Sequence, residues 1–405
     1  MKEYKPSNKI LEKYADVMVN YALNHGKGVK KGEVISLRGN EHAKPLLFEI
    51  YKKGIQAGAQ VLLDYTPEDS AYNFSEFFYN NASAQQISFF PEKYLKGKID
   101  TINHMIAVIS PSDMNILKNA DPKNIMRQGE SFKPYMQWRN KKEADGDFSW
   151  TLCNYGTKAM AAAANMTLKE YWNQIIRACY LKDENPVQIW KNLQKDIQSN
   201  VNKLDKLCID TLHVQGSDVD LHIQLSPKSA WKGGSGANIP SFEIFTSPDW
   251  RGTNGWIRFN QPLYRYGNII KDIYLEFKNG KVVTTSASKN EKLLKEMIAI
   301  KNADKIGEFS LTDARFSRIT KPMADTLYDE NIGGKYGNTH IALGMSYRDC
   351  YKGDYAKNTE KDWEKLGYNY SSVHTDIIST TDRTVTALLA SGKSKVIYQK
   401  GQFLL

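Results

Sequence analysis

The sequence contains no apolar run close to the roughly 20 residues that are needed to cross a bilayer. Its first 23 residues mix Lys, Glu and Asp into the apolar positions, which argues against a secretory signal peptide. Only four residues are cysteine, and no two of them have Cys-x-x-Cys spacing. We therefore expect a cytoplasmic protein with reduced thiols, without a disulfide framework, a zinc knuckle or a membrane partner.

A glycine-rich dinucleotide fingerprint is also missing. The first expected strand-to-helix turn is Arg38-Gly-Asn-Glu-His-Ala43, which lacks the repeated glycines that allow a backbone to approach a pyrophosphate. We therefore expect no nucleotide cofactor. The net charge of +10 could indicate a nucleic-acid partner, but the lysines are spread along the chain without a concentrated basic run. Binding of nucleic acid is therefore not expected.

The chain has 405 residues, which is long for a single hydrophobic core and suggests two domains. The charged stretch Lys182-Asp-Glu184 is the expected boundary, which gives an N-terminal domain of residues 1–184 and a C-terminal domain of residues 185–405. The apolar content of 41% and the charged content of 25% are those of an ordinary globular protein.

The N-terminal domain is predicted to be α/β. Strands are expected at residues 33–37 and 60–63, with a helix at 43–57 between them, and this βαβ unit implies a parallel sheet. Helix starts are expected at Ser7, which can act as an N-cap, and at Thr167, which has capping-box spacing to Glu170.

The apolar pattern changes to a period of two after residue 207. Segment 212–225 alternates apolar and polar residues around Gln215-Gly-Ser-Asp218, which predicts a β-hairpin. His213, Asp220 and His222 would share the face opposite the apolar side chains. They form a possible metal site, although polar residues are the default on the outer face of a sheet.

Further alternating segments and one helical segment follow in the C-terminal domain. Strands are expected at 255–259, 273–277, 281–286 and 307–311, and a helix at 290–300. The glycine-rich residues 231–237 are expected to form a flexible loop. The C-terminal domain is therefore predicted to be α+β, with a mainly antiparallel sheet that carries the metal site described next.

Residue types that bind divalent cations gather near the end of the sequence. Two of the seven histidines, His340 and His374, lie in a short interval close to Glu330 and Asp376. Imidazole and carboxylate groups are ligands of hard and borderline divalent cations. In an extended segment His374 and Asp376 would project to one face, so that both can reach one ion.

The relation between His340 and Tyr347 is open at this point. The two residues are seven positions apart, which places them on one face of a helix but on opposite faces of a strand. Gly344 lies between them and permits a tight bend or a close approach of the backbone.

Six separated motifs occur in the order that is typical of one enzyme family. They are Ile239-Pro-Ser-Phe-Glu-Ile-Phe-Thr-Ser-Pro-Asp249, Gly307-Glu308-Phe309, Tyr328-Asp-Glu-Asn331, His340-Ile-Ala-Leu-Gly344, Tyr347 and His374-Thr-Asp376. In these motifs the sequence resembles the aminopeptidase T family of dinuclear metal-dependent exopeptidases, which includes aminopeptidase S and the PepS enzymes. The resemblance extends over the whole chain.

The resemblance implies a set of metal ligands and two catalytic groups. Two divalent cations are implied; zinc is expected, and cobalt, manganese or magnesium are also compatible with such a site. Glu308 is expected to bridge the two ions, and Tyr347 to hydrogen-bond to the developing oxyanion or donate a proton. The implied ligands are Glu243, Glu308, Glu330, His340, His374 and Asp376.

The function that this resemblance implies is a metal-dependent aminopeptidase. A water activated by two cations would hydrolyse the N-terminal residue from short peptides with a free N-terminus. A cytoplasmic homodimer is implied, with active sites that face an enclosed cavity. The alternative is a non-catalytic, metal-dependent peptide-binding protein with a degenerate peptidase site.

Overall fold

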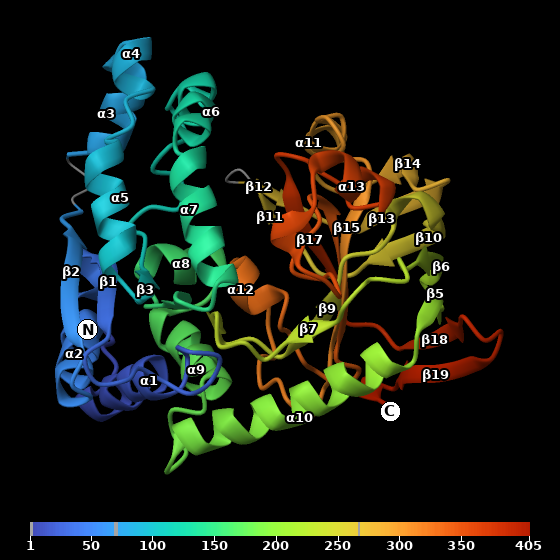
Figure 1. Cartoon of the computed structure of the whole chain (residues 1–405), viewed down its shortest axis with the longest axis horizontal. Coiled ribbons are helices and arrows are strands. Elements are labelled where there is room, and N and C mark those ends of the chain that lie inside the picture. The colour runs from blue at the N-terminus through green and yellow to red at the C-terminus, as the bar shows by residue number, and fades with distance from the viewer. Residues whose placement is uncertain (1–2, 69–71, 266–267) are drawn as a thin grey trace. The chain divides into compact units, whose positions relative to one another are not determined.

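The computed structural model describes residues 3–68, 72–265 and 268–405. The chain forms two compact units, each with its own sheets (Figure 1). The first unit contains Met1–Lys191 and Ser235–Ile239, and the second contains Asn192–Gly234 and Pro240–Leu405. Within the described residues, no helix has the length and apolar character that a membrane span requires.

A parallel sheet forms the centre of the first unit. Its strand order is β2-β1-β3-β4-β8, and all neighbouring strands run parallel. Helix α2 (Lys44–Gln56) connects β1 to β2 and packs against both, which confirms the predicted βαβ unit. The strands are β1 (Val34–Asn40), β2 (Gln60–Thr66), β3 (His104–Ile109), β4 (Ser149–Asn154) and β8 (Asn238–Ile239).

The predicted helix starts at Ser7 and Thr167 are confirmed. Helix α1 is Asn8–Asn20, and the Ser7 side chain accepts a hydrogen bond from a backbone N–H of its first turn. Helix α9 is Leu168–Ala178, and Thr167 forms the predicted capping box with Glu170. Two further helices are α8 (Lys158–Ala163) and α10 (Pro186–Lys206).

Five helices of the first unit are not predicted by the sequence pattern. Helices α3, α6 and α7 contain no fully buried residue, and Tyr135 and Trp138 of α7 are partly buried against the core of the first unit. The five helices are α3 (Phe74–Asn81), α4 (Ala84–Ile87), α5 (Glu92–Thr101), α6 (Pro122–Ser131) and α7 (Lys133–Ala144).

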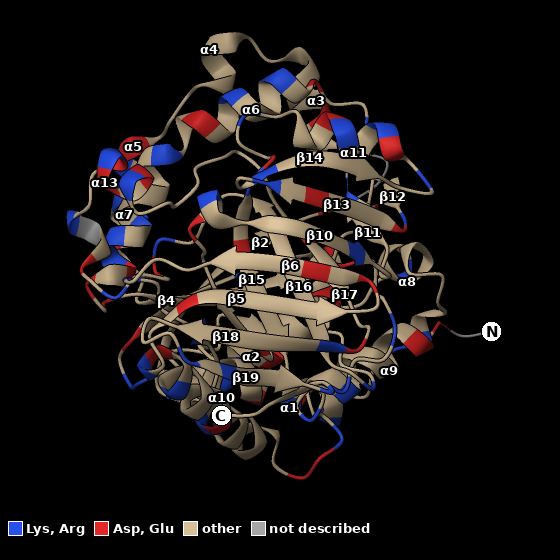
Figure 2. Cartoon of the chain, turned by 90° about the vertical axis from the view of Figure 1, so that its right-hand side faces the viewer, with Lys and Arg blue, Asp and Glu red and all other residues tan. Residues whose placement is uncertain are grey.

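The largest sheet of the second unit has eight strands and is antiparallel throughout. Figure 2 shows it face-on, with the predicted hairpin of β5 and β6 near its middle. The strands, in sheet order, are β14 (Lys281–Ser286), β13 (Ile273–Lys278), β10 (Asn254–Phe259), β6 (Val219–Gln224), β5 (Ile209–Gly216), β18 (Arg383–Leu389), β19 (Ser394–Gln399) and β20 (Gln402–Phe403).

A second antiparallel sheet has the order β17-β16-β15-β9-β7. Every residue of β15 and β16 is buried. One mainly antiparallel sheet was expected in this unit, and the structure has two large ones. The α+β character is as predicted. The strands are β7 (Lys232–Gly233), β9 (Glu243–Thr246), β15 (Ile306–Thr312), β16 (Asn338–Gly344) and β17 (His374–Ser379).

Smaller elements complete the second unit. Strands β11 (Leu263–Arg265) and β12 (Asn268–Ile270) form a separate pair. The helices are α11 (Glu291–Ile298), α12 (Thr326–Asp329) and α13 (Glu360–Lys365).

The glycine-rich residues 231–237 were expected to form a loop, but two of them form the short strand β7. A Cβ atom at Gly233 would lie 2.4 Å from the carbonyl oxygen of Glu243. The glycine therefore allows β7 to approach β9, which carries a candidate ligand.

A buried arginine at the start of β18 connects this strand to β10 and to the turn between β5 and β6. Arg383 is 1% exposed. Its Nη2 atom donates to the carboxylate of Asp218, 3.2 Å away, and to the carbonyl oxygen of Arg258, 2.7 Å away. Thr381 donates to the same carboxylate oxygen of Asp218 over 2.8 Å.

We predict that Arg383→Ala lowers the stability of the second unit by about 3–5 kcal/mol, because the carboxylate of Asp218 is then left without its buried cation. The measurement is the thermal unfolding of the chain by calorimetry. Lys295→Ala removes the exposed ion pair with Glu291 and serves as the control, with an expected loss below about 1 kcal/mol. Equal losses in both variants would contradict the role given to Arg383.

Candidate metal centre

The register of the five-stranded sheet places three of the predicted ligands on one face. Side chains of paired residues in an antiparallel sheet point to the same side, as do those of residues two apart on one strand. Glu308 pairs with Ala342, which in turn pairs with Asp376. His340 lies two residues before Ala342 on β16. Glu308, His340 and Asp376 therefore project from the same face.

Two more predicted ligands join this face from the edges of the sheet. Glu243 pairs with Thr312, which is four residues from Glu308 on β15. His374 pairs with Gly344, at the end of β16. His374 and Asp376 lie on β17, so the prediction that an extended segment directs both to one side is confirmed.

Two glycines shape the backbone beside these ligands. The register shifts between Ile306 and Glu308, and a Cβ atom at Gly307 would lie 2.3 Å from the carbonyl oxygen of Met345. Such a β-bulge re-aims the following side chain, here Glu308. Gly344 has a φ of +107°, and a Cβ atom there would lie 2.0 Å from the carbonyl oxygen of Val373. Both close approaches exclude a larger residue.

The bend at Gly344 settles the relation between His340 and Tyr347. His340 lies in a strand, and Tyr347 follows after the chain has turned at the end of that strand. The two side chains are therefore related by neither of the regular periods considered from the sequence.

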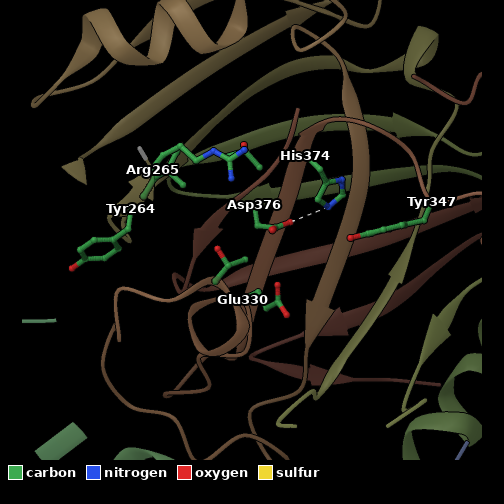
Figure 3. A pocket seen from close by; sticks show the side chains of 9 residues that line it. Tyr264, Arg265, Glu330, Tyr347, His374 and Asp376 are labelled. Carbon is green, nitrogen blue, oxygen red and sulfur yellow. Dashed lines mark ion pairs between the residues drawn. The ribbon is translucent and has the colours of Figure 1, made fainter. Parts of the chain in front are cut away.

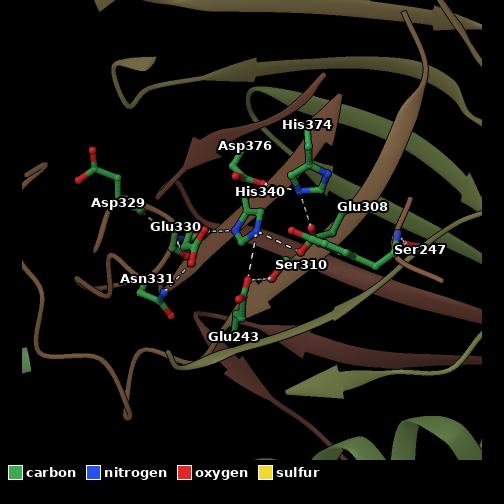
Figure 4. A network of polar contacts seen from close by, with 12 residues as sticks. Glu243, Ser247, Glu308, Ser310, Asp329, Glu330, Asn331, His340, His374 and Asp376 are labelled. Atoms are coloured by element: carbon green, nitrogen blue, oxygen red, sulfur yellow. Dashed lines mark hydrogen bonds and ion pairs between the residues drawn. The ribbon is translucent and has the colours of Figure 1, made fainter. Parts of the chain in front are cut away.

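Glu308 lies between the two imidazole rings (Figure 4). Its Oε1 atom is 3.6 Å from Nε2 of His340, and its Oε2 atom is 3.2 Å from Nε2 of His374. Ligand atoms bound to one zinc ion at about 2.0–2.2 Å are roughly 3.3 Å apart in a tetrahedral shell. Each carboxylate oxygen of Glu308 thus has the spacing of a ligand that shares an ion with one histidine.

Each histidine also has a second carboxylate neighbour. Oε2 of Glu243 is 3.4 Å from Nε2 of His340, and Oδ1 of Asp376 is 3.5 Å from Nε2 of His374. Two groups of metal-ligating side chains result, and they share Glu308. The groups are Glu243, Glu308 and His340, and Glu308, His374 and Asp376.

The second nitrogen of each imidazole has a partner of its own. Nδ1 of His340 lies 3.3 Å from Oδ1 of Asn338, and Nδ1 of His374 lies 2.8 Å from the carbonyl oxygen of Met345. With the proton on Nδ1, Nε2 presents its lone pair to the carboxylate cluster, as in a metal-bound histidine. Nε2 of His340 is buried and has no hydrogen-bond partner among the described residues. This arrangement fits a bound cation.

The electrostatics of the cluster favour positive charge at its centre. Burial alone would lower the pKa of His340, but the carboxylates of Glu243 and Glu308 raise this pKa to about 10. The pKa of His374 is likewise raised well above its usual value, against the effect of burial, by Asp376 and Glu308. Burial and neighbouring carboxylates raise the pKa of Glu330. Divalent cations would supply the missing charge.

Glu330 lies at the C-terminal end of α12 and belongs to neither of the two ligand groups. It is 8% exposed and lines a cavity of about 240 Å³ next to them (Figure 3). Its backbone carbonyl accepts a hydrogen bond from Nδ2 of Asn338, which also lies beside His340. The structure therefore brings Glu330 to the edge of the cluster.

Tyr347 lines the same cavity from the side of His374. Its ring centroid is 4.6 Å from that of His374 and 5.7 Å from that of Phe245. Its backbone N–H donates to Oγ of Ser247 over 2.8 Å. Tyr347 is 37% exposed, and partial desolvation together with the nearby carboxylates raises the pKa of its phenol, which remains a hydrogen-bond donor.

Some residues of the site are not found by the sequence analysis. Ser310 donates to Glu243 over 3.3 Å, and Asn338 positions His340. Each is two residues from a predicted ligand on the same strand. Residues two apart on a strand share a face, so this spacing could have identified both. Arg265, which lines the cavity, has no motif or spacing that could have identified it.

The comparisons with known proteins agree with a metal centre. The model of the family described as thermophilic metalloprotease (M29) matches residues 7–403. Aminopeptidase AmpS of Bacillus subtilis is 27% identical, over 97% of this chain and 98% of its own. Aminopeptidase PepS of Streptococcus thermophilus is 26% identical, over 98% of each chain.

A solved structure shares the fold. Wild-type AmpT from Thermus thermophilus superposes with a TM-score of 0.80, at 22% sequence identity, over 98% of this chain and 99% of that chain. The family match covers nearly the whole sequence, and the cluster on the five-stranded sheet offers the carboxylate and imidazole groups that a metallopeptidase requires. The chain therefore belongs to the thermophilic metalloprotease (M29) family and is a hydrolase of peptide bonds.

Proposed function

We propose that the chain is an aminopeptidase that removes the N-terminal residue from short peptides with the help of two divalent cations. The observation that carries this proposal is the position of Glu308. Its two oxygens face two different histidines, each of which has a further carboxylate beside it. A carboxylate placed in this way suits the bridge between two ions.

The charge of the cluster supports two ions rather than one. Four carboxylates gather around two imidazoles in a buried site, and two dications would balance their charge. Zinc is expected, and cobalt, manganese or magnesium are compatible with the oxygen-rich shell. Glu243 and His340 would hold one ion, His374 and Asp376 the other, with Glu308 between them and Glu330 completing a shell.

Bound cations supply a water of lowered pKa and polarise the scissile carbonyl group. The residues of the chain provide the surroundings for this chemistry. Tyr347 presents a protonated phenol to the cavity, from which it can donate a hydrogen bond to the oxygen that becomes charged during hydrolysis. Glu330 can accept a hydrogen bond from the free amine of the substrate.

The polarity of the cavity supports short peptides as substrates. Carboxylates line one part of it and Arg265 another (Figure 3). A short peptide carries a positive N-terminus and a negative C-terminus, and both would meet opposite charge. The volume of about 240 Å³ suits a small ligand and not a folded protein. A cytoplasmic homodimer, also proposed, is supported by the family membership alone.

The test of this function combines two measurements on the purified chain. We expect two divalent ions per chain and the release of an amino acid from an unblocked peptide but not from its N-acetylated form. Retained metal without any hydrolysis would favour the alternative, a non-catalytic protein that binds peptides through a degenerate site. Equal cleavage of the blocked and the free peptide would overturn the assignment as an aminopeptidase.

We predict that Glu308→Gln abolishes hydrolysis and weakens the binding of both ions by more than about 100-fold. Mutation of a residue that only hydrogen-bonds to a ligand typically lowers metal affinity by about 10- to 100-fold, and loss of a direct ligand should lower it further. Metal content and turnover are measured together. Glu276→Gln makes the same chemical change on the eight-stranded sheet and should leave both unchanged. Normal turnover in the Glu308 variant would disprove its bridging role.

We predict that Tyr347→Phe lowers turnover by roughly 100- to 1,000-fold, because the phenol no longer stabilises the charged oxygen. Its metal content should stay the same, since the ring still packs against His374 and Phe245. Tyr264→Phe is the matched control, because the phenol of Tyr264 points away from His374 and Asp376 (Figure 3). Loss of metal from the Tyr347 variant would show that the residue has a structural or ligand role.

A further inference from the structure

A second cluster of metal-ligating side chains lies outside the candidate centre. It consists of His213 on β5 and of Asp220 and His222 on β6. His213 pairs directly with His222 across the hairpin, and Asp220 lies two residues before His222. All three side chains therefore project from the same face of the eight-stranded sheet.

The three groups are close enough to share an ion. One ligand atom from each residue lies within 4.8 Å of the other two. Nε2 of His213 is 2.7 Å from Oδ1 of Asp220, and the two imidazole rings stack with their centroids 4.0 Å apart. The hairpin thus places two imidazoles and one carboxylate side by side.

The chemistry of the cluster suits a borderline transition ion. Two imidazoles and one carboxylate favour Zn²⁺, Ni²⁺ or Cu²⁺ over Mg²⁺ or Ca²⁺, which prefer oxygen ligands alone. Histidine binds a metal in its neutral form.

Binding requires only a local change at His213. Without an ion, the hydrogen bond between the two groups is made by a proton on Nε2 of His213 that is donated to Asp220. With an ion, this proton moves to Nδ1, and both the Nε2 lone pair and the carboxylate oxygen become ligands. The Nε2–H bond of His213 and its hydrogen bond to Asp220 are lost, and an N–H bond forms at Nδ1.

The outer face of the sheet leaves the cluster accessible. The side chain of Asp220 is 58% exposed and that of His213 is 29% exposed. Strands β5 and β6 lie toward the viewer in Figure 2. Three protein ligands on an accessible face leave room for water to complete the shell, and solvent can reach an ion that binds there.

We propose that His213, Asp220 and His222 form an exchangeable binding site for a divalent transition ion, separate from the candidate catalytic centre. The two sites lie on different sheets, since β5 and β6 take no part in the five-stranded sheet. This inference does not depend on the proposed peptidase mechanism, because it concerns binding alone.

The test measures ions bound by the untagged full chain after equilibrium dialysis against Ni²⁺ or Zn²⁺, and separately against Mg²⁺. We expect the double variant His213→Ala with His222→Ala to bind one Ni²⁺ or Zn²⁺ fewer than the unchanged chain, with the same Mg²⁺ content and the same rate of peptide hydrolysis. His42→Ala removes an exposed histidine elsewhere and should lose no ion.

Equal Ni²⁺ and Zn²⁺ contents in the double variant and the unchanged chain would overturn the proposal. So would an equal loss in the His42 variant, since binding would then follow the number of exposed histidines. Asp220→Asn tests the site without removing either ring and should weaken Ni²⁺ binding by 10-fold or more. If the chain proves inactive on peptides, the difference in bound ions still decides the question.

Discussion

The concentration of negative charge on one face of the five-stranded sheet is the constraint on which the second unit depends. Carboxylates are costly to bury unless cations or hydrogen-bond donors compensate them. Here Glu243, Glu308 and Glu330 are each less than 9% exposed, and the nearest cationic groups are the two histidines. Cations that bind such a site contribute to folding as well as to chemistry, because they join ligands from four strands.

The fold could be predicted from the sequence where apolar and polar side chains alternate along a strand, or where a helix has an apolar stripe. The βαβ unit, the hairpin of β5 and β6, and the shared face of His374 and Asp376 are such cases. Helices α3, α6 and α7 were not predicted, and none of them contains a fully buried residue. Phe74, Phe77 and Phe78 of α3 do have helical spacing, so this helix could have been found from the sequence.

The geometry of the site depends on features that no periodicity contains. The register shift at Gly307 directs Glu308, and the positive φ of Gly344 separates His340 from Tyr347. A sequence shows the glycines but not the carbonyl groups that they allow to approach. The family motifs named the expected ligands, while their common face follows only from strand pairing between distant segments.

The same residue types meet in two different environments in the second unit. At His340 the imidazole is buried, and its Nε2 atom lacks a hydrogen-bond partner among the described residues. At His213 the corresponding atom donates a hydrogen bond to the carboxylate of Asp220 near solvent. Tighter retention is therefore expected of the buried cluster, which has more ligands and less contact with solvent, than of the exposed one.

The path of the chain has a consequence for how the protein can be divided. Residues 235–239 belong to the first unit, where β8 completes the parallel sheet, although the second unit supplies the residues on both sides of them. Only three residues separate β8 from Glu243. Neither unit is a continuous piece of sequence, so a single proteolytic cut cannot yield one fragment for each complete unit.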